Sequence, residues 1–548
     1  MIANEDGTPS AGALIAITNL DTGEQRDVAT IGADGRFSAA VPPGEYALAV
    51  ASDRGFAWME KQAVPAADIQ VALSEKCHRV AGHVKTPSRP ANVNFARKSR
   101  STGDTFATAA RPDGSFAVCL PEAYYYVSLS GGMVSIPFDI SIPTAEVVEI
   151  TGFASDDIRR APPQGLRIAS SLPALVADIL AAKPTIIGLG ESTHGNAEHV
   201  TVRSDLTFEL IRHAGVRLLL FENDAIAGVA LDDYVNGANV DIAKAVSALG
   251  FWTTDTYEFR QFLERIRDYN MHSSERVHIW GIDLQNTILP VGILEANAAA
   301  LSIGDDELAA LKVATVKRGK EVPNLPPAQL QRLSALLSRL ATPKSKGRDD
   351  LLVAVAARSL ELQLHYWDGD MLGQYRGRRD AGMAALAGFV TSQLGVERAC
   401  LWAHAGHVSR EPSQAMLGQR LVEIPSVRYY AIGFYVYEGS VRAWDAAAKI
   451  GVISHPIPAA PPYTLEGAIM HAAGMPNIAW VPFRALPAAF ASWMKLPRYV
   501  REIGAAFNGI ENAMALHDIG KTFDAMVVIK TGHDSTPTPT GIRKAEHR

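Results

Sequence analysis

The chain has 548 residues, enough for two to four domains, and its 47% hydrophobic and 20% charged residues are typical of a soluble globular protein. The net charge of −6 is small for this length, and lysine and arginine form no cluster interleaved with aromatic residues, so we expect no nucleic-acid partner. No apolar run reaches the roughly 18 residues of a membrane-spanning helix, so we expect no membrane span.

Two segments near the start of the chain repeat one another. The copies read Asp34-Gly-Arg-Phe37 with Pro42 and Tyr46, and Asp113-Gly-Ser-Phe116 with Pro121 and Tyr125, so corresponding residues are 79 apart (113 − 34 = 79). Each copy alternates apolar and polar residues around glycine-containing turns, which predicts short antiparallel strands.

The repeats resemble the carboxypeptidase regulatory-like, transthyretin-type β-sandwich, which often precedes catalytic domains in secreted bacterial proteins. This resemblance implies two tandem all-β sandwiches, at residues 1–74 and 75–151. We expect them to act as spacer or stabilising modules, with carbohydrate binding as the alternative.

Cysteine usage gives neither a C-x-x-C redox pair nor a zinc-finger spacing. Cys77 and Cys119 both belong to the second repeat and could form a disulfide, whereas Cys400 lies in an apolar run and is expected in the core. The chain begins without the basic and apolar regions of a signal peptide. We expect a periplasmic or secreted protein whose signal is not part of this sequence, with a cytoplasmic location as the alternative.

Beyond Gly152 the pattern changes to long helical segments alternating with short apolar runs, which predicts an α/β domain at residues 152–534 with a central, mostly parallel sheet and helical insertions. The predicted strands are residues 185–189, 217–221, 277–280, 400–403, 429–435 and 523–529, and the clearest helices are 205–213, 257–270 and 351–366. Residues 305–345 look like an inserted helical pair that could close over a site. Residues 535–548 are predicted to be a disordered tail.

Polar side chains follow four of the predicted strands at the point where each strand ends. They are Glu191 and His194, Glu222 and Asn223, Asp283, and His404 and His407. Because the carboxyl ends of parallel strands meet at one edge of a sheet, we expect these side chains to converge on one cleft. The full G-x-G-x-x-G fingerprint and the G-x-S-x-G nucleophile elbow are both absent, which argues against a dinucleotide site and a serine hydrolase.

A metal centre is the rival interpretation of these residues. Glutamate, aspartate and histidine are all competent ligands for zinc or a similar ion. However, neither histidine pair has the H-E-x-x-H spacing of a helical zinc site. We therefore expect no metal and no other cofactor.

As a set, the motifs resemble the erythromycin esterase family. They are Gly190-Glu-Ser-Thr-His-Gly195, Phe221-Glu-Asn223, Gly281-Ile-Asp283, Tyr375-Arg-Gly-Arg-Arg-Asp380 and Trp402-Ala-His-Ala-Gly-His407, in this order along the α/β region. The resemblance implies a carboxylic ester hydrolase in which a histidine activates water against an ester or lactone carbonyl, as in macrolide opening. It implies neither a metal nor a covalent acyl-enzyme.

Carried over by motif and spacing, the resemblance makes His194 the general base. The other predicted catalytic residues are Glu191, Arg203, Glu222, His404 and His407. A carboxylate such as Glu222 would orient the base, Arg203 would hold a carboxylate or stabilise the oxyanion, and one of the two later histidines would donate to the carbonyl oxygen.

Three further residues are predicted to bind substrate: Asp283, Tyr375 and Trp252. Asp283 is alternatively part of a structural ion-pair group with Arg379 and Asp380. The remaining histidines, such as His272, His278 and His365, have no motif around them and are expected to be structural or exposed.

Two departures from the family pattern bear on the substrate. Ala405 and Gly406 stand where many members carry an asparagine and another small residue, and the tandem repeats are not part of a dedicated antibiotic-resistance esterase. We therefore expect a small-molecule ester or lactone as substrate, with macrolides only one option. The alternatives are a metal-dependent hydrolase built on the same glutamates and histidines, and a non-catalytic ligand-binding protein; the sequence does not predict the oligomeric state.

Overall fold

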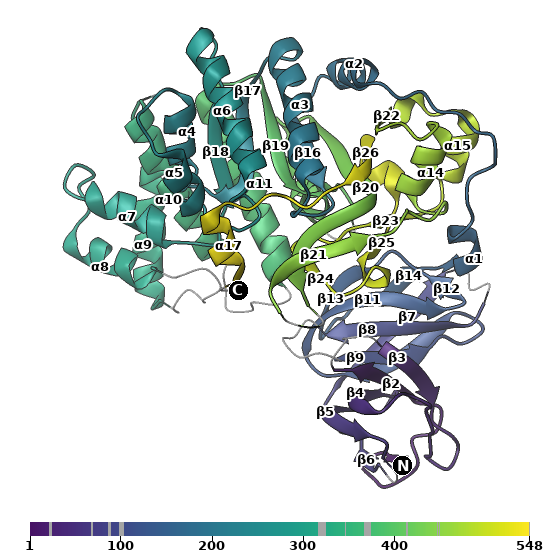
Figure 1. Cartoon of the computed structure of the whole chain (residues 1–548). Helices are drawn as coiled ribbons and strands as arrows, with labels where there is room; N and C mark the ends of the chain where they lie inside the picture. Colours follow the sequence, from purple (N-terminus) through teal and green to yellow (C-terminus); the bar gives the residue numbers. More distant parts are fainter. Residues whose placement is uncertain are drawn as a thin grey trace.

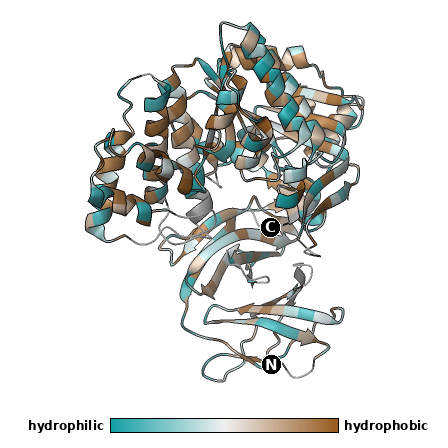
Figure 2. Ribbon diagram, turned by 60° about the vertical axis from the view of Figure 1, so that its left-hand side comes forward, coloured by the Kyte–Doolittle hydropathy of each residue, from teal (hydrophilic) through white to brown (hydrophobic). Residues whose placement is uncertain are grey.

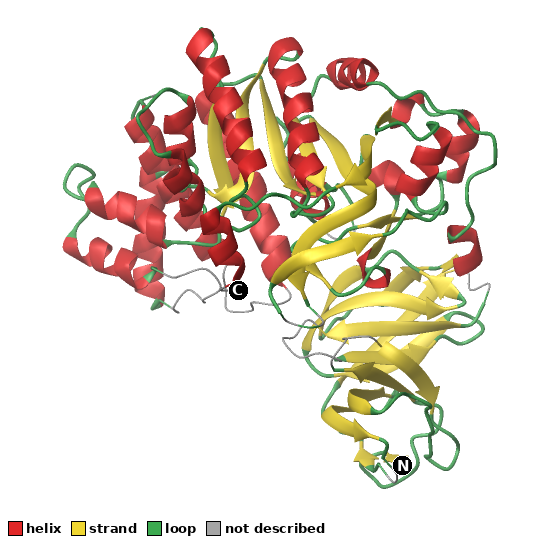
Figure 3. Ribbon diagram, viewed as in Figure 1, coloured by secondary structure: helices red, strands yellow, loops and turns green. Residues whose placement is uncertain are grey.

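The computed structural model describes residues 1–548 except 21–24, 67–68, 86–88, 98–103, 316–324, 346, 367–373, 413–414, 447, 449 and 547–548. A strand-rich N-terminal region is followed by a mixed α/β domain (Figure 3). The predicted multidomain organisation is confirmed at this level. Among the described residues no helix is both long and apolar enough to cross a membrane.

The N-terminal region consists of two units stacked below the α/β domain (Figure 1). The first unit contains β1 (Ile2–Ala3), β2 (Leu14–Asn19), β3 (Gln25–Thr30), β4 (Gly44–Ala51), β5 (Phe56–Val64) and β6 (Val71–Ala72). The second contains β7 (His78–Lys85), β8 (Ala91–Arg97), β9 (Thr105–Ala109), β10 (Ser115–Leu120), β11 (Ala123–Gly131), β12 (Met133–Val134), β13 (Phe138–Ile142) and β14 (Val148–Thr151).

Each unit is built around a four-stranded antiparallel sheet. The strand order is β3-β2-β4-β5 in the first unit and β13-β11-β8-β9 in the second. The second unit also contains a three-stranded sheet of order β10-β7-β14. The repeat found in the sequence has a structural counterpart: the Tyr46 hydroxyl donates to the Pro42 carbonyl, and the Tyr125 hydroxyl donates to the Pro121 carbonyl, each at 2.9 Å. Both rings are fully buried, so the same hydrogen bond fixes the same corner in each unit.

The two units pack directly on one another. Ala49 and Ala51 of β4 belong to the hydrophobic core of the second unit rather than to that of the first. The Cys119 amide donates to the Ser52 carbonyl at 2.7 Å. The structure also joins Cys77 and Cys119 by a disulfide within the second unit.

A short linker of β15 (Phe153–Ala154) and α1 (Ser155–Ile158) connects the second unit to the α/β domain. β15 pairs with β12 of the second unit. The other end of the linker, α1, is bound by the α/β domain, where Arg498 donates to the carbonyls of Asp157 and Ile158 at 3.0 and 2.9 Å. Trp493 Nε1 donates to the Arg160 carbonyl at 2.8 Å. These bonds hold the second unit in a fixed place against the α/β domain.

The α/β domain is built on a nine-stranded sheet. Its strands are β16 (Ile186–Glu191), β17 (Val216–Asp224), β18 (His278–Asp283), β19 (Arg398–His404), β20 (Tyr429–Asp445), β21 (Val452–Ile457), β22 (Ile478–Pro482), β24 (Ala506–Phe507) and β26 (Ala525–Gly532). The main path is β18-β17-β19-β16-β20-β26-β22; all its pairings are parallel except the antiparallel edge pair of β22 and β26. β23 (Arg498–Arg501) and β25 (Met514–His517) form a separate antiparallel pair.

Helices cover both faces of this sheet (Figure 1). The helices are α2 (Leu172–Ala182), α3 (Ala197–His213), α4 (Val229–Val235), α5 (Ile242–Ala248), α6 (Tyr257–His272), α7 (Ile288–Ala296), α8 (Asp305–Val313), α9 (Pro327–Leu340), α10 (Arg348–Tyr366), α11 (Gln374–Leu394), α12 (Ala405–Val408), α13 (Leu417–Val422), α14 (Leu465–Ala472), α15 (Ala488–Trp493), α16 (Ile519–Thr522) and α17 (Pro539–Glu546), with short 3-10 turns η1 (Phe483–Ala485) and η2 (Glu511–Ala513).

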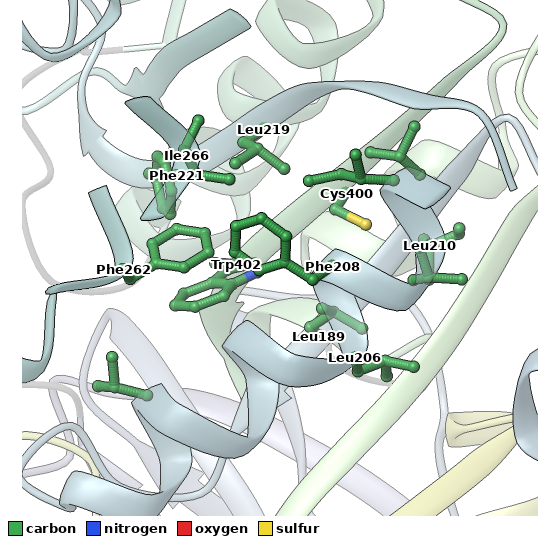
Figure 4. Close-up of a cluster of buried hydrophobic side chains, with 14 of the residues drawn as sticks. Leu189, Leu206, Phe208, Leu210, Leu219, Phe221, Phe262, Ile266, Cys400 and Trp402 are labelled. Atoms are coloured by element: carbon green, nitrogen blue, oxygen red, sulfur yellow. The ribbon is translucent and has the colours of Figure 1, made fainter. Parts of the chain in front are cut away.

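Successive strand residues point to opposite faces, so each strand contributes to two cores. Ile187 and Leu189 of β16 pack with helices α2, α3, α5 and α6, whereas Ile186 packs with the helices α7 to α11 on the other face. In the first of these cores Trp402 stacks on Phe262 with ring centroids 4.5 Å apart (Figure 4). Hydrophobic residues accordingly fill the interior of the domain, while hydrophilic residues alternate with them along the outer helices (Figure 2).

One prediction about the periphery needs correction. Residues 535–546 are not a disordered tail, because α17 packs on the domain, and Thr538 before it and Thr540 in its first turn bind the buried carboxylate of Asp255. The described part of residues 305–345 forms α8 and α9, which bury most of their leucines against the core under α10. No described residue of this pair lines the cavity of the site in this structure.

Candidate active site

The polar residues predicted at the strand ends gather at one edge of the sheet. Glu191 ends β16, Glu222 lies near the end of β17, Asp283 ends β18 and His404 ends β19. Glu191 and His404 are direct register partners of neighbouring parallel strands. A cavity of about 940 Å³ opens at this edge. The convergence expected from the carboxyl ends of parallel strands is therefore present.

His194 is held by Glu191, three residues before it. The His194 ring nitrogen Nδ1 lies 2.8 Å from Glu191 Oε1, and Arg203 Nη2 donates to the other oxygen, Oε2. Burial raises the pKa of Glu191, but the charge of Arg203 and the hydrogen bond with His194 lower it to about 2. The carboxylate is thus ionised at neutral pH and accepts the Nδ1 proton of the imidazole.

That hydrogen bond fixes the tautomer of His194. With the proton on Nδ1, Nε2 carries a lone pair, and no other described residue forms a hydrogen bond with it. His194 lines the cavity and its side chain is 19% exposed, so a water molecule can reach Nε2. A neutral imidazole oriented in this way is competent as a general base.

Arg203 is placed to hold Glu191 rather than to meet a substrate. Its guanidinium donates to the His199 carbonyl at 2.9 Å and to Glu191, and it stacks over the Trp402 ring at 4.4 Å. It is 3% exposed. Of the two roles predicted for Arg203, the geometry favours holding a carboxylate over stabilising an oxyanion.

Glu222 contacts Arg379, His407 and the backbone of His404. Oε1 accepts from Arg379 Nη2 at 2.9 Å and lies 3.2 Å from His407 Nε2, while Oε2 accepts from the His404 amide at 2.9 Å. Burial raises the pKa of Glu222, but the charges of His407 and Arg379 bring it well below its usual range. Glu222 contacts His407 and not His194, so it does not orient the base as predicted.

The two histidines around α12 have opposite protonation states. Burial lowers the pKa of His407, but Asp380 at 2.6 Å and Glu222 at 3.2 Å raise it to about 10, so its ring is an imidazolium at neutral pH. Burial lowers the pKa of His404 to about 4. His404 Nδ1 accepts from the Gly406 amide, and Nε2 donates to the Ser192 carbonyl. His404 is therefore neutral with both nitrogens occupied.

Arg379 occupies a more central position than the sequence indicated. Asp283 binds its Nε and Nη2 atoms at 2.9 and 2.8 Å, and Nη1 lies 3.1 Å from His407 Nε2. Because the imidazolium of His407 directs its Nε2 proton to Glu222, it offers Nη1 no lone pair. Arg379 lines the cavity, so Nη1 can donate to a bound substrate.

The predicted substrate contacts of Asp283 and Trp252 are not supported. Asp283 is 2% exposed and does not line the cavity, because both carboxylate oxygens bind Arg379. Trp252 packs with Val452 and Ala545 and does not line the cavity, whereas its chain neighbours Phe251 and Thr253 do. The side chain of Tyr375 lies outside the described residues.

Sequence reasoning missed part of the cavity wall. Glu502 follows β23 and accepts a hydrogen bond from the Tyr435 hydroxyl at 2.8 Å. Burial raises the pKa of Glu502, but His517, 3.4 Å away, contributes to lowering this pKa to about 2. No local motif marks it. The second N-terminal unit also contributes to the wall, through Tyr126, Ser128 and Asp139 among others.

The side-chain geometry does not resemble a metal centre. Among the described residues no group of three or more His, Cys, Asp or Glu side chains is arranged to hold a metal ion. Glu191 and Glu222, which contact His194 and His407, are already paired with Arg203 and Arg379. The arrangement instead offers a base, a fixed imidazolium and a guanidinium around one cavity.

Comparison with known proteins places the chain among hydrolases of one family. The profile of the family described as erythromycin esterase matches residues 211–532. This match begins after Glu191, His194 and Arg203, so the roles of these three rest on the geometry. No curated protein matches the sequence.

Solved structures share the fold. A protein from Bacillus cereus is similar with a TM-score of 0.56 and 19% identity, covering 70% of this chain and 100% of that chain. A succinoglycan biosynthesis protein has a TM-score of 0.51 and 18% identity, covering 70% of this chain and 97% of that chain. A mutant of the erythromycin esterase EreC in its open conformation has a TM-score of 0.47 and 18% identity, covering 69% of this chain and 100% of that chain. At these identities the first two likenesses show the fold alone.

Proposed function

Because the chain belongs to the erythromycin esterase family, whose members are hydrolases, we propose that it cleaves an ester or lactone by water activated at His194. The observation that carries this proposal is the pair of His194 and Glu191, in which Glu191 binds Nδ1 of a histidine that lines the cavity and Nε2 has no hydrogen-bond partner among the described residues. The substrate is a small molecule. Macrolides are one option among such esters.

In the proposed reaction a water molecule bound to His194 Nε2 attacks the carbonyl carbon. The histidine takes the water proton as the new C–O bond forms, and returns it to the leaving alkoxide as the ester bond breaks. Glu191 stabilises the intermediate imidazolium, as the carboxylate of a catalytic triad does. No acyl-enzyme forms, since the nucleophile is the water itself.

Negative charge develops on the carbonyl oxygen during the attack. Arg379 Nη1 is the donor in the best position to meet it, and the imidazolium of His407 adds a second positive charge beside it. Preorganised donors of this kind contribute strongly in a site with little water. We assign His404 a structural role, because both its ring nitrogens are occupied.

The test is hydrolysis of an ester panel that includes activated aryl esters and a macrolide lactone. We expect His194→Ala to lose about 10²- to 10⁴-fold in kcat. His272→Ala is the matched control, because the side chain of His272 on α6 is 77% exposed and far from any motif. Full activity of His194→Ala, with its fold intact by circular dichroism, would exclude His194 as the base.

The same panel distinguishes this reaction from a metal-dependent hydrolysis. We expect turnover to persist after dialysis against a chelator, because the glutamates of the site are paired with arginines. Loss of activity on chelation and recovery with added zinc would favour the metal-dependent alternative. Ligand binding without turnover of any ester would favour a non-catalytic protein.

We also propose that the two N-terminal units are carboxypeptidase regulatory-like modules of a periplasmic or secreted protein. The repeated tyrosine hydrogen bond supports the relationship between the units. The disulfide of Cys77 and Cys119 supports an oxidising compartment, because such bonds are rare in the cytosol.

A further inference from the structure

The cavity at the sheet edge is bounded by two different domains. Its lining includes His194 and Arg379 from the α/β domain, and Tyr126, Ser128 and Asp139 from the second N-terminal unit. The wall from the second unit is made by strands β11 and β13, together with β12 and the segment that follows it. A unit that served only as a spacer would have no need to enclose the site.

Tyr126, Ser128 and Asp139 share one face of the sheet formed by β11 and β13. Tyr126 is directly opposite Asp139 in the register, so their side chains project to the same side. The neighbouring residues Tyr125 and Val127 point the other way, into the core of the unit. Tyr126 is 38% exposed although it is a large aromatic residue, because the cavity lies over its ring.

The first unit provides an internal comparison for this face. At the repeat distance of 79, Tyr126 corresponds to Ala47 (126 − 79 = 47) and Ser128 corresponds to Ala49 (128 − 79 = 49). Both alanines are completely buried, and Ala49 packs against the core of the second unit. The same face is thus a close-packed contact in one copy and a cavity wall with larger, polar side chains in the other.

The second unit is held rigidly enough to act as a wall. Arg498, which is itself 2% exposed, binds the linker carbonyls of Asp157 and Ile158, and β12 pairs with β15 of the same linker. Side chains mounted on a sheet that is fixed in this way keep their position relative to the base.

We propose that Tyr126, Ser128 and Asp139 contact the substrate and determine which esters are accepted. The structure favours an ester or lactone that is long enough to reach from His194 to β11. It would place an apolar or ring surface on Tyr126 and direct hydroxyl or amino groups to Asp139 and Ser128. This inference rests on the proposed hydrolase function and adds the substrate class.

The experiment compares small and large esters with the full-length protein. We expect Tyr126→Ala and Asp139→Asn to leave kcat/KM for p-nitrophenyl acetate within about twofold of wild type. Towards bulky hydroxylated p-nitrophenyl esters and a macrolide lactone, kcat/KM should fall about tenfold or more, mainly through KM. The larger Tyr126→Trp should exclude the bulky esters while it keeps the small one.

Two matched controls lie in the same unit. Tyr124→Ala removes a tyrosine from the same face of β11 outside the cavity, and Glu149→Gln neutralises an exposed acid on β14. Both should behave as wild type, and thermal unfolding should show that all variants fold. Equal effects on small and large esters, or none on either, would overturn the assignment while the hydrolase function stands. Absence of ester hydrolysis by the wild-type protein would overturn both.

Discussion

His404 and His407 show how one residue type acquires opposite properties three positions apart. His407 lies between the carboxylates of Asp380 and Glu222, whereas His404 caps α12 with its own ring and faces the Ser192 carbonyl. Their pKa values of about 10 and about 4 follow from these partners and from burial. The sequence predicted both residues in the site, but it carries no information about which carboxylate each one meets.

The charge of His407 is predicted to depend on Asp380. In Asp380→Asn the pKa of His407 should fall towards its ordinary value near 6.5, so activity that needs the imidazolium should be lost as the pH rises through neutrality. The wild-type protein should keep the charge until the pH approaches 10. Imidazole nitrogen NMR, with His407→Gln for assignment, and the pH profile of kcat/KM check this. An unchanged His407 signal in Asp380→Asn would contradict it.

The same proton links folding to pH. The pKa of His407 is higher in the folded protein than in the unfolded chain, so its contribution to stability is complete below about pH 6.5. The contribution declines between about pH 6.5 and 10, because only the folded state still holds the proton there. The difference in unfolding free energy between wild type and His407→Gln should shrink across this window, as measured by denaturant titration.

Arg379 is predicted to act through its geometry as well as its charge. Arg379→Lys keeps the positive charge but cannot bind Asp283 through two nitrogens and still present a third to the cavity. We expect kcat to fall about 10- to 100-fold with little change in KM, because the contact forms in the transition state. Arg212→Lys, on the exposed surface of α3, is the control. A change confined to KM would indicate a ground-state contact instead.

At the scale of elements, the apolar strands of the sheet could be predicted because they are buried on both faces. β16, β17, β18, β19 and β26 all lie within a few residues of their predicted positions, and β20 begins where predicted but continues ten residues further, to Asp445. β23 was missed because it contains Arg498 and Arg501, whose guanidinium groups are buried but bind carbonyl oxygens such as that of Val436. No pattern of apolar residues identifies a strand whose buried side chains are arginines.

The C-terminal helix illustrates a related difficulty. The segment before α17 is rich in threonine and proline, which predicts disorder, yet the hydroxyls of Thr538 and Thr540 both bind Asp255 at 2.5 and 2.7 Å. Lys544 Nζ also donates to the Asp255 carboxylate, at 2.9 Å. A distant, fully buried carboxylate supplies the partners, and the local composition cannot indicate it.

Lys544 is therefore predicted to stabilise the fold more than its neighbour on the same helix. Lys544→Ala should lower the free energy of unfolding by ~1–3 kcal/mol, because it leaves the buried Asp255 with fewer donors. Arg543→Ala, at an exposed position of α17, should change it by less than about 0.5 kcal/mol. Chemical denaturation of the two variants measures the difference. Equal effects would mean that the contact with Asp255 contributes nothing.

At the scale of the whole molecule, stability of the second unit affects the site, since the unit forms part of the cavity wall. The disulfide of Cys77 and Cys119 closes a loop with a sequence separation of 42. Replacing both cysteines by serine should destabilise the second unit by ~2–4 kcal/mol. Differential scanning calorimetry should then show an earlier transition for the N-terminal region. A reductant should shift the wild-type protein in the same direction and leave the double variant unchanged.

The contact between Arg498 and the linker also has a consequence for biosynthesis. Arg498 follows Ile158 by 340 residues, so the N-terminal units leave the ribosome long before their anchor exists. Domains generally fold as units in the order of their synthesis. The two units can therefore fold early, but they stay unanchored until nearly the whole chain has been translated. The cavity is completed last, and a nascent or truncated chain would carry folded modules without a finished site.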